Sequence, residues 1–157
     1  MLLRVALFLH VIAAIFWVGG MLFLTLVVAP YLISIPDPKE RSKIYQVVGK
    51  KYRFFGWVAI ITLLVTGPII LYTLYGIDLD AAMSPSFYGS RLGTTLYLKL
   101  ALVVVIVLSS LLHDFWIGPK AKTSPALSRY ARIFGRGNLV IALLIVMVAV
   151  MLRAGGL

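Results

Sequence analysis

The chain has 157 residues, of which 62% are hydrophobic and 13% charged, with a formal net charge of +10, and its mean hydropathy is +1.04. These few polar residues cannot cover the surface of a water-soluble globule of this size. Most of the surface must therefore face lipid. The sequence has no cysteine, which excludes disulfides, thiolate metal sites, covalently attached c-type haem and cysteine-ligated iron–sulfur clusters.

Four stretches are apolar enough, at roughly 20 residues or more each, to cross a hydrocarbon core of about 30 Å as helices. They leave little room for another domain, so the sequence predicts an all-α integral membrane protein in which residues 1–157 form one four-helix bundle. Arg4 precedes an apolar run, as in a signal peptide, but the run continues well beyond the roughly 15 residues of a signal core, so we expect a retained helix. The predicted spans are about 3–33, 54–74, 94–117 and 133–152.

The charged residues lie almost entirely between these spans. Sorting of Lys and Arg to the cytoplasmic side explains the net charge without a nucleic-acid partner, and it places the first and third loops in the cytoplasm. Both termini are then outside, in a cytoplasmic (inner) membrane of bacterial type. The first loop carries Lys39, Arg41, Lys43, Lys50, Lys51 and Arg53, the middle loop Asp78, Asp80 and Arg91, and the third loop Lys120, Lys122, Arg129, Arg132 and Arg136.

His10 is the first ionisable residue inside a span, where such groups are expensive and need a partner or a purpose. At helical spacing after it come Ala13, Ala14, Trp17 and Gly20. Small residues with one ring suit either a helix interface or a flat ligand pocket. His10 is therefore either a partner in an interhelical hydrogen bond or a ligand for a metal or haem.

The second span has two notable features, one before it and one within it. Pro36 and Pro38 end the first helix, and the spaced apolar residues of 38–51 predict a short amphipathic helix at the membrane interface. Within the span, the Thr66-Gly67-Pro68 sequence predicts a kink, with the threonine hydroxyl or a neighbouring helix satisfying a freed carbonyl. Such a kink opens a cavity or serves packing.

Lys99 in the third span is predicted to lie at about the depth of His10, from about 1.5 Å of rise per residue. Its long stem would let the ammonium group reach the headgroups. The alternative is a polar pocket that His10 and Lys99 share. Arg4, Arg91 and Arg153 would stand at the rim of that pocket.

A second polar cluster is expected where the third span ends and the fourth begins. One interpretation is structural, with Asp114 paired to an arginine and His113 bonded to Asn138, and the other is a site open to the cytoplasm. Gly118 and Pro119 are expected to stop the third helix. The cluster consists of His113, Asp114, Arg132, Arg136 and Asn138.

The two histidines cannot hold one haem within a protomer, because helical rise separates them in depth by about 16 Å and both nitrogens must lie about 2 Å from the metal. Soft Cu(I) prefers thiolate, thioether and imidazole ligands. Methionine in an apolar span is more often packing material. The candidates are His10 with Met1, Met21, Met147 or Met151.

The motifs resemble the copper-resistance D (CopD) membrane family and its relative, the HemJ-type protoporphyrinogen oxidase. The segment from His10 through Trp17 to Gly20, the run from Lys99 to His113, and the entry from Arg132 to Asn138 are similar to three helices of that family. The residue after Asn138 is Leu139, where HemJ tends to have Glu, and His113-Asp114-Phe115 looks closer to small CopD-like proteins.

The resemblance implies a helical bundle that handles haem b or copper. The leading hypothesis is a haem-b-binding membrane redox protein, a possible oxidoreductase with a quinone or another electron partner. His10 would be the axial ligand, Trp17 and Lys99 would line the pocket, and Arg4 or Arg91 would lie near the propionates. The alternatives are a copper-transport or copper-resistance protein and a non-catalytic scaffold or accessory subunit. Gly19 and Gly20 offer a surface for a homodimer.

Overall fold

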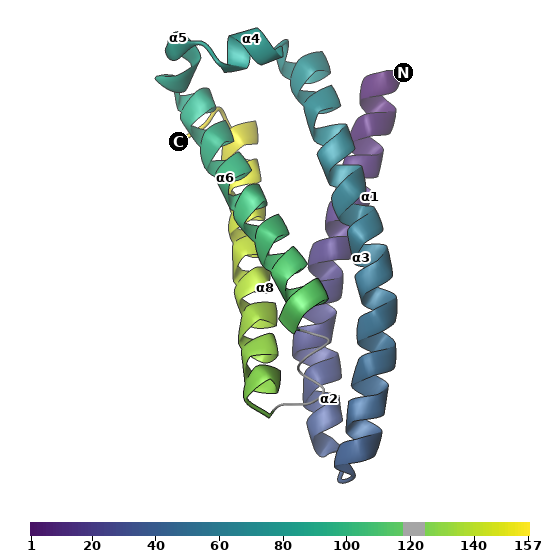
Figure 1. Cartoon of the computed structure of the whole chain (residues 1–157). Coiled ribbons are helices and arrows are strands. Elements are labelled where there is room, and N and C mark those ends of the chain that lie inside the picture. Colours follow the sequence, from purple (N-terminus) through teal and green to yellow (C-terminus); the bar gives the residue numbers. More distant parts are fainter. Residues whose placement is uncertain (118–124) are drawn as a thin grey trace. The chain divides into compact units, whose positions relative to one another are not determined.

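The computed structural model describes residues 1–117 and 125–157, and their side chains except those of 125–129, 131 and 132. In these residues every regular element is helical and none is a strand (Figure 1). Four helical stretches, Leu2–Ser34, Pro38–Tyr75, Arg91–Ile117 and Ile133–Arg153, are long and apolar enough to cross a membrane. The prediction of an all-α protein with four membrane-crossing helices is confirmed.

Several predictions fall outside the described residues. These are the stop at Gly118 and Pro119, the loop charges Lys120 and Lys122, and the side chains of Arg129 and Arg132.

The first stretch consists of α1 (Leu2–Phe23), the π-helix η1 (Leu24–Val28) and α2 (Ala29–Ser34). The change of helix type has a cause in Pro30, which has no amide hydrogen to donate and whose ring presses on the preceding turn. A wider turn just before Pro30 relieves that pressure without ending the helix.

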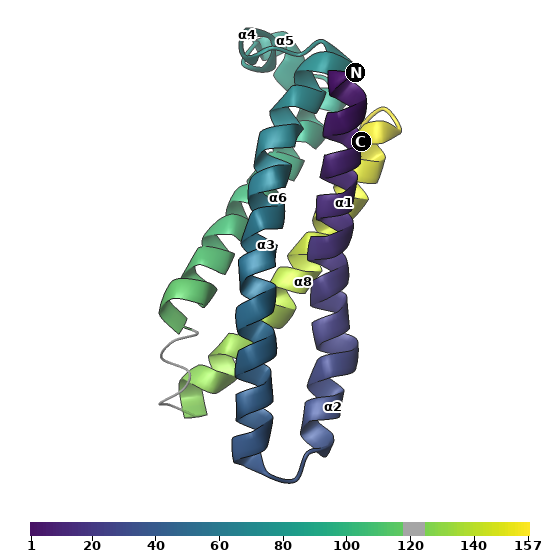
Figure 2. The same cartoon turned by 90° about the vertical axis from the view of Figure 1, so that its right-hand side faces the viewer.

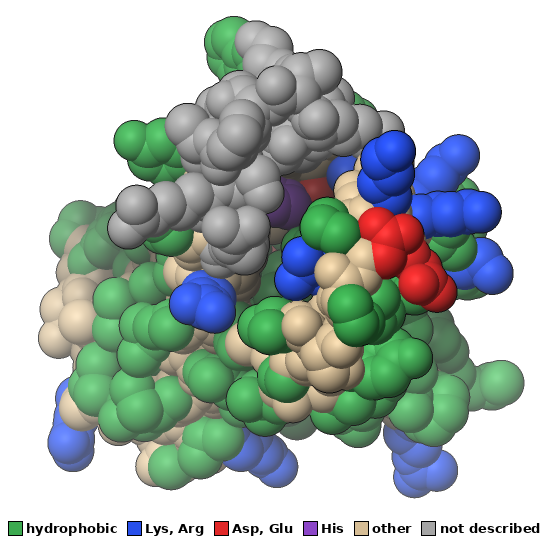
Figure 3. Space-filling view, turned by 90° about the horizontal axis from the view of Figure 1, so that it is seen from below, with side chains coloured by type: hydrophobic (Ala, Val, Ile, Leu, Met, Phe, Trp, Pro, Cys, Tyr) green, Lys and Arg blue, Asp and Glu red, His purple; other side chains and the backbone are tan. Residues whose placement is uncertain are grey.

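The second stretch is one helix, α3 (Pro38–Tyr75). The interfacial helix predicted for 38–51 is therefore the first part of α3 rather than a separate element. At about 1.5 Å per residue α3 is about 57 Å long, well above the roughly 30 Å that a bilayer core requires. Its basic half extends past the apolar part, and Figure 3 shows Lys and Arg side chains around a largely hydrophobic surface at this end.

The chain divides into two compact units, Met1–Leu74 and Tyr75–Leu157, and each is described by itself. In the first unit, α1 and α3 lie side by side (Figures 1 and 2). The Tyr52 hydroxyl donates to the Trp17 carbonyl at 2.6 Å, and the Tyr52 and Phe16 rings stack with centroids 6.2 Å apart. A Cβ at Gly20 would overlap the Tyr52 ring, so this glycine makes the contact possible.

In the second unit, two short helices, α4 (Leu79–Ala82) and α5 (Pro85–Tyr88), connect to α6 (Arg91–Leu111). Side chains of Asp78, Ser84 and Ser90 accept hydrogen bonds from the amides that begin the three helices. The Tyr88 and Tyr97 rings stack with centroids 4.3 Å apart, and the Tyr97 hydroxyl bonds to the Ala82 carbonyl. The aromatic middle loop is thus fixed on α6.

The last spans pack closely, α6 with its continuation η2 (Leu112–Ile117) against α8 (Pro125–Arg153). After α8, Gly155 and Gly156 have φ of 105° and 94°, and the Gly156 amide donates to the Met151 carbonyl at 2.9 Å. This arrangement satisfies carbonyls at the end of the helix. Leu157 then contacts the start of α6, with its amide 2.8 Å from Thr95 Oγ1.

Candidate metal-binding histidines

His10 on α1 is joined to α3 by a hydrogen bond between its Nδ1 and Thr66 Oγ1, 2.7 Å apart. Thr66 is buried, and its hydroxyl also lies 2.6 Å from the Thr62 carbonyl, to which it donates. A hydroxyl has one proton, so His10 Nδ1 must be the donor to Thr66. In the neutral ring the lone pair is then on Nε2, which is the state of a histidine that binds a metal.

Gly67 contributes to the same arrangement. A Cβ built at Gly67 would lie 3.9 Å from His10 Cε1, so the imidazole lies directly against the backbone of α3. The kink that the sequence predicts at Thr66-Gly67-Pro68 stays a prediction, and in the structure Thr66 and Gly67 are the α3 residues that lie next to His10. The hydroxyl satisfies Thr62, and α3 continues as one helix through Pro68.

The other residues of the predicted pocket divide between the two units. Trp17 shares α1 with His10 and is 8% exposed, and Arg4 is exposed near the start of that helix. Lys99, half-buried, and Arg91, exposed, belong to α6 of the second unit. Arg91 Nε donates to the Leu157 main-chain oxygen at 2.5 Å, which gives this arginine a partner inside its own unit. A shared pocket of His10 and Lys99 stays a prediction.

The candidate thioether ligands are also spread out. Met21 follows His10 on the same helix, about 16 Å further along, so the two cannot bind one ion together. Met147 and Met151 lie one turn apart on α8, Met147 48% exposed and Met151 half-buried. In the part of the chain that the structure describes, no group of three or more histidine, aspartate or glutamate side chains is placed to hold a metal ion.

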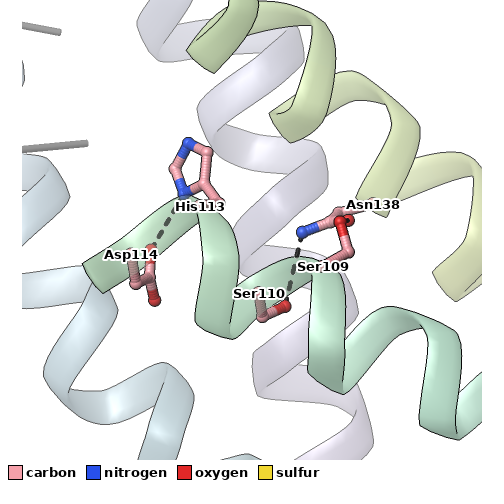
Figure 4. A network of polar contacts seen from close by, with 5 residues as sticks. All are labelled: Ser109, Ser110, His113, Asp114 and Asn138. Atoms are coloured by element: carbon pink, nitrogen blue, oxygen red, sulfur yellow. Dashed lines mark hydrogen bonds and ion pairs between the residues drawn. The ribbon is translucent and has the colours of Figure 1, made fainter. Parts of the chain in front are cut away.

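The second polar cluster forms between η2, the end of α6 and α8 (Figure 4). Ser109 donates to Asn138 Oδ1 at 2.5 Å, and Asn138 Nδ2 donates to Ser110 at 3.3 Å. His113 Nδ1 lies 2.9 Å from Asp114 Oδ1. The expected bond between His113 and Asn138 is therefore replaced by other partners.

The sequence analysis missed Ser109 and Ser110. Their position one turn before His113 was the available signal, since Ser side chains bond across membrane helices. Of the two arginines assigned to this cluster, Arg136 is exposed on α8, and the side chain of Arg132 lies outside the described residues.

The four long apolar helices define a multi-pass membrane protein. Two of them carry an imidazole whose Nδ1 is held by a hydrogen bond, so His10 and His113 are candidate metal ligands. The chain belongs to the CopD family, described as copper resistance protein D, whose model matches residues 46–152. The match covers Lys99, His113 and Asn138 and begins after His10. The predicted relation to HemJ stays a prediction.

A relative and a search of solved structures complete the comparison. An uncharacterized protein of Aquifex aeolicus (strain VF5) is 41% identical over 150 residues, covering 95% of this chain and 94% of the relative. No solved structure matches the chain.

Proposed function

We propose that this chain is a copper-handling membrane protein in which Nε2 of His10 binds Cu(I) as cargo. The observation that carries the proposal is the hydrogen-bond series from His10 Nδ1 to Thr66 and on to the Thr62 carbonyl, at 2.7 and 2.6 Å. Membership of a family described as copper resistance protein D supports the choice of metal. Copper thus replaces haem as the leading hypothesis.

The residues fit a transported ion better than a resident one. Imidazole suits copper, and thioether sulfur selects Cu(I) among first-row ions. The described residues offer single ligands and the Met147 and Met151 pair rather than a closed set. A cargo must leave its site as well as enter it, so few ligands at each position favour passage.

Substitution of Thr66 by valine tests this proposal. Valine preserves the shape but removes the oxygen that accepts from His10, and loss of such an orienting partner lowers metal affinity about 10- to 100-fold. The measurement is an anaerobic competition titration of purified protein with a chromophoric Cu(I) chelator. We expect His10→Ala to abolish binding at this position and Thr66→Val to weaken it.

Thr62→Val is the matched control. The Thr62 hydroxyl bonds only the backbone of its own helix, at 2.8 Å from the Val58 carbonyl, among the contacts described. Its removal makes the same chemical change one turn away, so copper affinity should stay at the wild-type value. Unchanged binding in both His10→Ala and Thr66→Val would refute the proposal. If Met147 and Met151 supply thioethers, replacing both should also lower Cu(I) binding.

Haem b is the second candidate, because an axial imidazole needs the same orientation and tautomer as a copper ligand. The absence of a side chain at Gly67 also keeps bulk away from the imidazole on the α3 side, as a flat macrocycle requires. The test is an absorption spectrum, oxidised and dithionite-reduced, of protein from cells supplied with haem. A Soret band lost in His10→Ala would establish haem, and a featureless spectrum would leave copper. A scaffold would lose stability in His10→Ala with no ligand signal to lose.

A further inference from the structure

The side chains of His113 and Asp114 are hydrogen-bonded although the two residues are neighbours in the chain (Figure 4). Successive side chains in an α-helix point about 100° apart and do not face each other. Both residues lie in the π-helix η2, where a turn closes over one more residue and neighbours diverge by a smaller angle. The wide turn therefore permits the pairing.

This pairing orients the imidazole. An ionised carboxylate can only accept a hydrogen bond, so His113 Nδ1 carries the proton and Nε2 the lone pair. In many metal-binding histidines a carboxylate on the far nitrogen holds the ring orientation in this way. The His113 and Asp114 side chains are 24% and 17% exposed, so the pair is sheltered but within reach of a ligand.

The helix that carries the pair is anchored immediately before it. Asn138 of α8 is 8% exposed and bonds both Ser109 and Ser110, which lie among the last three residues of α6. These two contacts fix the rotation of α6 on α8 one turn ahead of His113. A ligand nitrogen that is held by its own helix and by a neighbouring helix is preorganised for binding.

We propose that His113 Nε2 is a second Cu(I)-binding position, oriented by Asp114 and separate from His10. The inference rests on the proposed function, since it takes copper as the cargo. His113 lies about 33 Å along a span that begins at Arg91, whereas His10 lies about 12 Å along a span that begins at Leu2. Binding of Cu(I) at either position exchanges ligands on the ion with no change of oxidation state.

The experiment is a count of Cu(I) ions bound per chain, by the same anaerobic competition titration with the chelator. We expect two ions in the wild type, one in His10→Ala, one in His113→Ala and none in the double variant. Asp114→Asn should weaken the second ion about 10- to 100-fold and leave the first unchanged. Asp80→Asn, which alters an exposed carboxylate on α4, is the control.

The outcomes separate the two proposals. One ion in the wild type that disappears in His10→Ala would keep the proposed function and overturn this inference, as would two ions in His113→Ala. No ion in the wild type would overturn both. Thermal unfolding of each variant shows whether it folds, and if His113→Ala does not, the affinity of Asp114→Asn decides the question.

Discussion

Thr66 shows how one hydroxyl can set the chemistry of a distant residue. Because it donates to the Thr62 carbonyl, it can only accept from His10. The direction of a single proton thus selects which imidazole nitrogen carries the lone pair. Sequence predicted that the Thr66 hydroxyl or a neighbouring helix would satisfy a carbonyl freed by Pro68, but it did not predict the bond between Thr66 and His10, which is 56 residues away.

Gly20 offers a prediction at the same scale. A side chain there would overlap the Tyr52 ring, which is held by the Trp17 carbonyl and by stacking on Phe16. Overpacking of this kind costs about 1–3 kcal/mol, so Gly20→Ala should lower the free energy of unfolding in detergent by that amount. Gly19→Ala is the control, since a Cβ at Gly19 meets nothing within 4 Å. Equal stability of the two variants would show that the Tyr52 contact is unimportant.

At the scale of elements, both π-helices occur shortly before a proline in the sequence. Pro30 follows η1 by two residues, and Pro119 follows η2 by two residues in the sequence. Hydropathy located the helices because apolar length is sufficient for that purpose. It did not indicate the turn type, which depends on how the chain accommodates a missing amide, nor the side-by-side placement of His113 and Asp114 that the wide turn allows.

The pairing of α6 with α8 should depend measurably on Asn138. Hydrogen bonds between membrane helices contribute on average about 0.6 kcal/mol and at most about 1.7 kcal/mol. We expect Asn138→Ala and Ser109→Ala each to destabilise the protein within that range. Their double-mutant cycle should give a coupling energy above zero, measured by unfolding in mixed micelles. Strict additivity would mean that the 2.5 Å contact between them has no energetic role.

For the whole molecule, sequence predicted the helical class, the four crossings and the family, all of which are confirmed. It did not predict the contacts that orient the candidate ligands. Each span is apolar nearly all round, so no polar stripe marks the face that meets a neighbour. Pairs such as His10 with Thr66, or Asn138 with Ser110, depend on register between helices far apart in the chain. Three further statements stay predictions: that all four helices form one bundle, that the named residues bind a ligand, and that both termini lie on the outer side of the membrane.

The orientation has a direct test because the chain has no native cysteine. Single cysteines would replace the exposed Ser42 of α3 and Ser86 of α5, which are predicted to lie on opposite sides of the membrane. Positive-inside sorting predicts that a membrane-impermeant maleimide labels Ser86→Cys in intact cells and labels Ser42→Cys only after permeabilisation. The reverse pattern would invert the topology.

Because α3 is one long helix, we expect the contact between Thr66 and His10 to depend on the thickness of the bilayer. The 38-residue helix carries the basic residues near one end and Thr66 towards the other, within one continuous helix. A helix longer than the hydrocarbon core responds to acyl-chain length by tilting, and a tilt of this helix moves Thr66 relative to α1. Lipids with longer or shorter acyl chains should therefore change how firmly Thr66 holds His10, which Cu(I) titrations in bilayers of different thickness would measure.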